Sequence, residues 1–264
     1  MKLTNTNEHI KTSGHKVLVY GISGAGKTTL ASTTPHCIIL SMESGLKSIS
    51  HLSIPVIDIT KDDNGIAFKT AKEKYNKFLA ALQWLGLPEQ KLKYRTVFID
   101  SLTELASIIF TMNKDAMEAS GKNDGFKVWG DYATQLSKLL RALRDADHYN
   151  VVFSCLEDCS EDDLKRKFYQ PQVDGNGAKQ SLLPIFDEVW RLIVDDKGVR
   201  SILTKPKNNM AAKSRSNALS EVEPPNLNAI FTKMNDHVST LLNAGQEKLN
   251  LSKTAPIQPQ ETKK

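Results

Sequence analysis

The chain has 264 residues, of which 40% are hydrophobic and 25% charged, so it can bury a sizeable core and is neither disordered nor collagenous in composition. Its formal net charge of +5 is too small to prove a polyanionic partner, although residues 197–220 contain basic side chains and no acidic one. The three cysteines lack the spacing of a disulfide framework, which excludes a disulfide-framed protein. Residues 1–16 contain no apolar leader, and no apolar run is long enough to span a membrane, so we expect a cytoplasmic protein.

Short apolar runs alternate with helix-compatible segments in the first part of the chain. The β-branched and apolar runs predict strands at residues 16–20, 37–42, 54–59, 94–99 and 151–156. Apolar residues at helical spacing predict helices at residues 68–85, 102–117 and 129–146, and a further helix that starts at residue 28. This alternation predicts an α/β fold with a mostly parallel, twisted sheet flanked by helices.

The second part of the chain has a different pattern. Residues 157–181 are polar and rich in Gly and Gln, which favours a long, mobile, functional loop. Residues 188–194 and 199–204, joined by Asp-Asp-Lys-Gly, predict an antiparallel hairpin, and residues 227–242 predict a last helix. We therefore expect a flexible N-terminus over residues 1–14, one domain over 15–243, and a disordered tail over 244–264 that has too few apolar residues to pack.

The segment GISGAGKT at residues 21–28 matches the P-loop pattern Gly-x-x-x-x-Gly-Lys-Ser/Thr. It follows a predicted strand and opens a predicted helix, so backbone amides and the positive helix end converge on phosphate. Lys27 would face the outer phosphates, and the Thr28 hydroxyl would bind Mg²⁺. The motif predicts ATP and Mg²⁺ as ligands and these nucleotide-binding residues: Gly21, Ile22, Ser23, Gly24, Ala25, Gly26, Lys27, Thr28 and Thr29.

Two carboxylates complete the predicted site. Asp100 follows a buried strand and fits the Walker B position, where an acidic residue holds the metal; Asp100 or Ser101 could instead be a helix N-cap. Glu43 ends the strand after the P-loop helix and is the candidate base for hydrolysis. The alternative for Glu43 is a solvated loop carboxylate.

These residues resemble the RecA-type core, and more narrowly the phage AAA-domain nucleotide-binding proteins that include single-strand annealing recombinases. The resemblance covers residues 15–216 and rests on the P-loop and on these shorter segments: IILSMESGL at 38–46, VFIDS at 97–101, WGDY at 129–132, Pro171, and KSR at 213–215. It implies a RecA-like P-loop NTPase core with an antiparallel hairpin at its C-terminal end. It also implies that Glu43 is the catalytic base of an ATPase in a phage protein that works inside a bacterial host.

The resemblance further implies two DNA-facing loops, at residues 120–127 and 157–180. Their basic and aromatic side chains would bind single-stranded DNA: Lys122, Lys127, Lys165, Arg166, Lys167, Phe168, Tyr169 and Lys179. Acidic residues in the second loop oppose this interpretation, and solvated loops with incidental charge are the alternative.

A neighbouring subunit is also implied. Lys205 and Lys207 would reach its nucleotide and neutralise developing charge, with Arg215 as the rival candidate. Leu156 departs from the family, where a polar sensor such as His or Gln is common, which puts in doubt how DNA binding would reach the hydrolytic site.

The leading hypothesis is an ATP-hydrolysing protein that binds single-stranded DNA and promotes annealing or recombination. We expect a homo-oligomer, as a ring or filament, with a single-strand-binding protein as a further partner and no membrane partner. The alternatives are a small-molecule P-loop kinase and an ATP-switched replication or helicase-loading partner, because a fold does not determine function.

Overall fold

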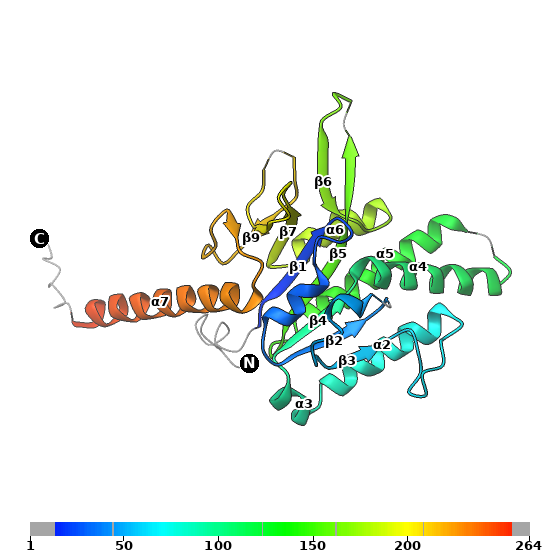
Figure 1. Cartoon of the computed structure of the whole chain (residues 1–264), viewed down its shortest axis with the longest axis horizontal. Helices are drawn as coiled ribbons and strands as arrows, with labels where there is room; N and C mark the ends of the chain where they lie inside the picture. The colour runs from blue at the N-terminus through cyan, green and yellow to red at the C-terminus, as the bar shows by residue number, and fades with distance from the viewer. Residues whose placement is uncertain (1–13, 44, 123, 162, 208, 255–264) are drawn as a thin grey trace, which may run out of the picture.

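The computed structural model describes residues 14–43, 45–122, 124–161, 163–207 and 209–254, with side chains as far as residue 245 (Figure 1). One mixed sheet runs through the molecule in the strand order β10-β8-β7-β1-β5-β4-β2-β3, with β6 and β9 attached at its side. The parallel strands are β1 Lys16–Gly21, β2 Cys37–Ser41, β3 Val56–Asp58, β4 Thr96–Asp100, β5 Asn150–Glu161 and β7 Glu188–Val194. The α/β fold predicted from the sequence is confirmed.

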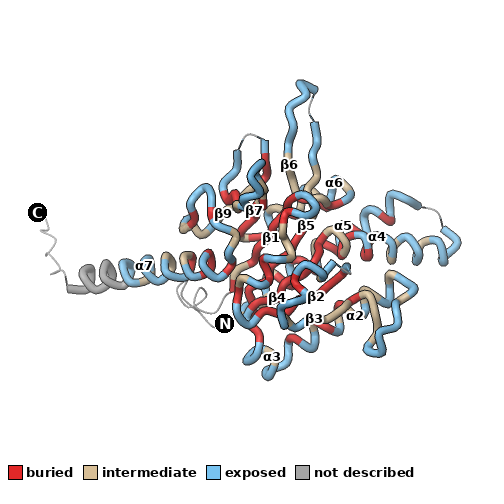
Figure 2. The backbone as a smooth tube through the Cα atoms, viewed as in Figure 1, coloured by how far each residue is buried: buried red, intermediate tan, exposed pale blue. Residues whose placement is uncertain are grey.

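The buried residues gather along the central strands of the sheet (Figure 2), and alternation along these strands divides the core into two faces. Leu18 and Tyr20 of β1 point to the face covered by α2 Ala71–Leu85, α4 Leu102–Ala119 and α5 Gly125–Arg144. Val17 and Val19 point to the other face, against η1 Thr28–Thr33 and α7 Leu227–Thr254. The remaining short helices are η2 Leu46–Ile49, α3 Pro88–Lys93 and α6 Asn176–Ile185.

Strand register brings the predicted motifs to one edge of the sheet. Ser41 of β2 lies opposite Asp100 of β4, and Gly21 of β1 lies opposite Leu156 of β5. Parallel strands place their carboxyl ends at the same edge. The segments that follow β1, β2, β4 and β5 therefore meet there, although they are far apart in the sequence.

Local capping explains two helix starts. Ser101 is the N-cap of α4, and its Oγ accepts from the Glu104 amide at 3.3 Å, so Asp100 is not needed as a cap. Asp124 caps α5, and its carboxylate accepts from the Lys127 amide at 3.0 Å. The helix therefore begins at Gly125, earlier than the predicted start at residue 129.

The prediction of a long mobile loop at residues 157–181 is wrong. β5 continues to Glu161 and pairs antiparallel with β6 Lys167–Pro171, which gives a two-stranded arm (residues 157–171) that projects from the body, and α6 follows (Figure 1). A ribbon exposed on both faces needs no apolar alternation, so its sequence looks like a loop. The arm nevertheless forms a regular ladder, with Glu157 opposite Pro171 and Glu161 opposite Lys167.

The predicted hairpin near residue 197 is present. β7 pairs antiparallel with β8 Arg200–Leu203, and β9 Lys213–Ser214 and β10 Val222–Glu223 complete this side of the sheet.

The last helix, α7, runs to Thr254, beyond the predicted end at residue 242. The predicted disordered tail is therefore helical from 244 to 254, while residues 255–264 lie outside the described residues, as do residues 1–13 of the flexible N-terminus predicted over 1–14. Among the described helices none is both long and apolar enough to cross a membrane.

Candidate functional site

A cavity of about 310 Å³ lies at the carboxyl edge of the sheet, where the P-loop meets the ends of β2 and β4. Its polar lining comes from five separate segments of the chain. The lining residues are Ser23, Gly24, Gly26, Lys27, Thr28, Thr29, Glu43, Gly45, Ser48, Asp100, Ser101, Leu156 and Arg200. The predicted P-loop, Glu43 and Asp100 thus share one cavity.

The P-loop backbone requires glycine at two positions. Gly24 and Gly26 have φ values of 78° and 98°, which are left-handed conformations that favour glycine. A Cβ on Gly26 would also lie 2.8 Å from the Arg200 Nε. The following helix, η1, is a short 3-10 helix rather than a long α-helix, so backbone amides and Lys27 are the main anion-binding groups of this loop.

Lys27 closes the P-loop on itself in this structure. Its Nζ donates to the Gly21 carbonyl at 2.7 Å and to the Ile22 carbonyl at 2.8 Å. Burial lowers the pKa of the Lys27 amine below its ordinary value, which means that its charge lacks full solvation. A phosphate group at the loop would stabilise the charged amine, because it would bring negative charge close to it.

Asp100 and Thr28 form the candidate metal site. The Thr28 Oγ1 donates to the Asp100 Oδ2 at 2.7 Å, and the Ser154 Oγ donates to the other carboxylate oxygen. The side-chain atoms that could bind a metal here are all oxygens, the ligand type that Mg²⁺ prefers. The described residues contain no group of three or more His, Cys, Asp or Glu that could hold a metal by themselves. This set fits an ion bound by one or two protein oxygens together with substrate phosphates.

Glu43 lies just beyond β2 at the rim of the cavity. The Ser101 hydroxyl donates to the Glu43 Oε1 at 2.5 Å, and the Ser41 hydroxyl donates to the Glu43 carbonyl. Glu43 is exposed, so water can reach its carboxylate. The contact with Ser101 holds the Glu43 carboxylate beside the residue that follows Asp100, at the cavity lining.

Two residues of this site were not identified from the sequence. Ser154 lies in the middle of β5 and shows no signal beyond its being polar in an apolar run. Arg200 begins β8, and its Nε donates to the Ala25 carbonyl at 2.9 Å. The hairpin was predictable, but the register that places its first arginine beside the P-loop was not.

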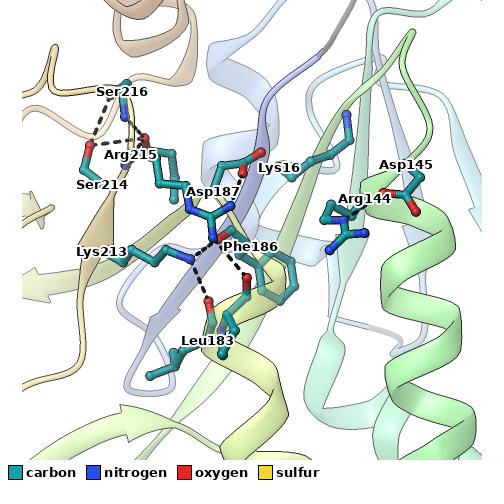
Figure 3. Close-up of polar contacts among 12 residues, drawn as sticks. Lys16, Arg144, Asp145, Leu183, Phe186, Asp187, Lys213, Ser214, Arg215 and Ser216 are labelled. Atoms are coloured by element: carbon teal, nitrogen blue, oxygen red, sulfur yellow. Dashed lines mark hydrogen bonds and ion pairs between the residues drawn. The ribbon is translucent and has the colours of Figure 1, made fainter. Parts of the chain in front are cut away.

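The predicted trans-acting residues lie outside the cavity lining. Lys205 and Lys207 follow β8 and are exposed, and Lys207 forms an ion pair with Glu221. Arg215 lies at the opposite edge of the sheet, where its Nη1 is 3.0 Å from the Asp187 carboxylate (Figure 3). Within this chain none of the three reaches the nucleotide cavity.

Several predicted DNA-binding side chains already have partners in the fold. Lys127 pairs with Asp131 at 2.7 Å, and Lys179 pairs with Asp158 at 2.9 Å. The Arg191 guanidinium lies 3.7 Å from the centroid of the Tyr169 ring, so one ring face is covered. Tyr169 therefore packs through one ring face at the base of the arm, and its role in stacking on bases remains a prediction.

The other predicted DNA-binding residues are exposed. Lys165, Arg166, Lys167 and Phe168 lie near the end of the arm, where Phe168 is 38% exposed. Lys122 is exposed in the connection between α4 and α5. The exposed end of the arm therefore carries the basic residues 165–167 together with the acidic residues Glu161 and Asp163, so its charges are mixed.

Comparison with known proteins gives a family and a distant structural likeness. Residues 13–216 match the family described as AAA domain. One solved structure that is similar to the chain is a prototypical ATPase from the type III secretion system of pathogenic bacteria, with 18% identity and a TM-score of 0.43. That match covers 69% of this chain and 51% of the ATPase, so the chain spans about half of its length. Curated protein sequences gave no match.

Proposed function

We propose that this chain, which belongs to the AAA domain family, binds ATP with Mg²⁺ in the cavity at the carboxyl edge of its sheet and hydrolyses it. The observation that carries the proposal is the 2.7 Å contact between the Thr28 hydroxyl and the Asp100 carboxylate, next to Lys27 in the same cavity. A hydroxyl from the P-loop and an acidic residue at the end of another strand of the sheet are the protein ligands that a P-loop ATPase uses for magnesium.

Each side chain of the cavity has a separate task in this proposal. The P-loop amides and the Lys27 amine bind the phosphates, and Lys27 exchanges its two loop carbonyls for phosphate oxygens. Thr28 and Asp100 would hold Mg²⁺, which, when bound, offsets negative charge on the phosphates. Glu43 takes the proton of the attacking water, while the Ser101 hydroxyl holds the carboxylate in place.

Calorimetry and phosphate release test this function together. The protein should bind a non-hydrolysable ATP analogue more tightly with Mg²⁺ than with a chelator present, and it should release phosphate from ATP. Binding without phosphate release to water, combined with phosphorylation of an added small molecule, would favour the kinase alternative. A well-folded protein that binds no nucleotide would refute the proposal.

We propose single-stranded DNA as the second ligand, because the arm projects from the body (Figure 1) and carries the basic run at residues 165–167, although Glu161 and Asp163 lie near that run in the sequence. Lys165, Arg166 and Lys167 lie there beside the exposed Phe168 ring, which offers charge for phosphates and a surface for a base. In this proposal the protein promotes strand annealing or recombination as a homo-oligomer on the DNA.

Neutralising Lys165, Arg166 and Lys167 tests the DNA ligand. The triple variant should bind single-stranded DNA more weakly and lose about 0.7 from the log–log salt slope for each lost phosphate contact. Its ATP affinity should remain, because the arm tip does not line the cavity. ATP turnover measured with and without single-stranded DNA completes the test. Unchanged DNA binding in the variant would exclude the arm tip as the DNA site.

We also propose that Lys205 and Lys207 act on the nucleotide of a neighbouring subunit, because both are exposed and outside their own cavity. Replacing both should reduce hydrolysis in the assembly. Mixing this variant with Glu43→Gln should restore part of the activity where intact lysines meet an intact glutamate. Absence of rescue in verified mixed assemblies would contradict a shared site.

A further inference from the structure

The hairpin β7–β8 brings a second cation to the P-loop. Arg200 lies opposite Val194, beyond the level at which β1 ends, and its side chain crosses to the loop that follows β1. The Arg200 Nε donates to the Ala25 carbonyl at 2.9 Å. A Cβ built on Gly26 would lie 2.8 Å from the Arg200 Nε. The arginine therefore covers the peptide that joins Ala25 to Gly26.

Arg200 differs from other arginines of this side of the sheet in its partners. Arg191 forms a two-bond ion pair with Glu157, at 2.7 and 2.9 Å, and Arg215 pairs with Asp187. For Arg200, the described residues provide a backbone carbonyl and no carboxylate. Its positive charge is thus not balanced by an ion pair in the described part of the chain, although it lines the nucleotide cavity with Lys27 and Thr28.

We propose that Arg200 binds the phosphates of the nucleotide in cis, as a second cation beside Lys27. The inference rests on the proposed ATP function and adds a residue of the chain's own hairpin to that site. A guanidinium has several N–H donors, so donation of Nε–H to Ala25 leaves further donors for phosphate oxygens. Hydrogen bonds between arginine and phosphate are charge-assisted and can be paired, which makes them stronger than contacts between neutral groups.

The Ala25 carbonyl contact also positions the guanidinium before ligand arrives. Arg200 is exposed, and an unattached arginine there would lose side-chain freedom on binding phosphate. Because Nε is already bonded to the loop, part of this ordering precedes ligand binding. The P-loop and Arg200 therefore form one anion site on two elements: the loop after β1 and the first residue of β8.

Two substitutions and a matched control test this role. Arg200→Gln removes the charge, Arg200→Lys keeps the charge but removes the planar fork, and Lys197→Gln removes a charge from the exposed turn of the same hairpin. Titration calorimetry would measure the Kd of a non-hydrolysable ATP analogue, ADP and adenosine. The unfolding temperature without nucleotide would report on any structural role.

The expected result is a phosphate-specific loss. Arg200→Gln should weaken binding of the ATP analogue about tenfold or more, Arg200→Lys should weaken it less, and Lys197→Gln should leave it unchanged. Adenosine binding and the unfolding temperature should stay at wild-type values. Equal weakening for adenosine and the ATP analogue, or a lowered unfolding temperature that accounts for the loss, would show that Arg200 only shapes the loop and would overturn the inference.

The same titrations separate this inference from the proposed function. Wild-type affinity in Arg200→Gln, together with lost affinity in Lys27→Ala, would overturn the role of Arg200 and leave the P-loop site intact. Wild-type affinity in Lys27→Ala as well would overturn the P-loop site itself, and with it the inference.

Discussion

The two ends of the parallel sheet use charged side chains in opposite ways. At the amino end, Lys16 Nζ donates to the Gly14 and Tyr149 carbonyls at 2.7 and 2.9 Å, and Lys213 Nζ donates to the Leu183 and Phe186 carbonyls (Figure 3). At the carboxyl end, Lys27 and Arg200 bond to carbonyls of the P-loop. The first set ties separate elements of the fold together away from the cavity, whereas both cations of the second set bond to carbonyls of one loop at the cavity, which a ligand can reach.

At the amino end, the buried Glu188 carboxylate has hydrogen-bond donors for both of its oxygens. Its side chain is fully buried and accepts from the Trp190 Nε1 at 2.9 Å and from the Ser214 hydroxyl at 3.1 Å. It also accepts from the amides of Arg215 and Ser216, both at 3.1 Å. A buried carboxylate is costly unless its oxygens are bonded, so these donors stabilise it. The comparison teaches that charge alone does not mark a site; the partners of the charge do.

The largest effect should come from Glu43→Gln, at the carboxyl end. The amide can still accept the hydrogen bond of Ser101 but cannot take a proton, so ATP turnover should fall about 1,000-fold while the ATP affinity remains. Steady-state phosphate release and titration of a non-hydrolysable analogue measure the two quantities. Glu161→Gln on the arm is the control. Turnover at the wild-type rate would exclude Glu43 as the base.

Lys27→Ala should have the next largest effect, on binding. It removes the amine that faces the outer phosphates and leaves only backbone donors, so the affinity for ATP should fall about 100-fold. Calorimetry measures the Kd, and far-ultraviolet circular dichroism checks the fold. Lys197→Ala, in an exposed turn, should bind normally. A folded Lys27→Ala protein with wild-type affinity would remove the P-loop assignment.

Glu188→Gln, at the amino end of the sheet, should lower stability and leave ATP binding intact. This is the reverse of the result expected for Lys27→Ala at the carboxyl end. The amide loses one acceptor and the charge that its four donors face, so the free energy of unfolding should fall by about 2 kcal/mol. Urea denaturation measures it. Glu221→Gln, an exposed control, should leave the free energy of unfolding close to the wild-type value. Weakened ATP binding in folded Glu188→Gln would show that the two ends are coupled.

Arg215→Ala should have the smallest effect. Its pair with Asp187 is partly exposed, with side-chain exposures of 55% and 39%, so its loss should cost less than about 1 kcal/mol. ATP turnover of the assembly should remain, because we assign the trans role to Lys205 and Lys207. A large loss of turnover, restored by mixing with Glu43→Gln, would instead make Arg215 the residue that acts between subunits.

The arm shows where sequence patterns are least informative. Residues 157–171 have no apolar alternation because most of the ribbon faces solvent, so a loop and a two-stranded arm look alike in the sequence. What holds the base of the arm is tertiary: Glu157 pairs with Arg191 of β7, and the Arg191 guanidinium covers Tyr169. The same contact covers one face of the Tyr169 ring.

The sequence by itself determined the fold class and the central residues of the site. Strand runs and helical spacing predict the parallel sheet, and the P-loop carries its chemistry in consecutive residues, so no tertiary information is needed to recognise it. Asp100 and Glu43 could be placed together from the sequence because Asp100 ends β4 and Glu43 lies just beyond β2, and parallel strands end at one edge.

Only the tertiary structure decided which cations serve the cavity. Arg200 and Arg215 lie in the same basic stretch and look alike in the sequence. Hairpin register brings Arg200 to the Ala25 carbonyl, whereas β9 pairing brings Arg215 to Asp187 at the other edge. The physical reason is that an ion pair or a ligand contact depends on which residues meet across strands, and that register is set by the packing of the whole sheet.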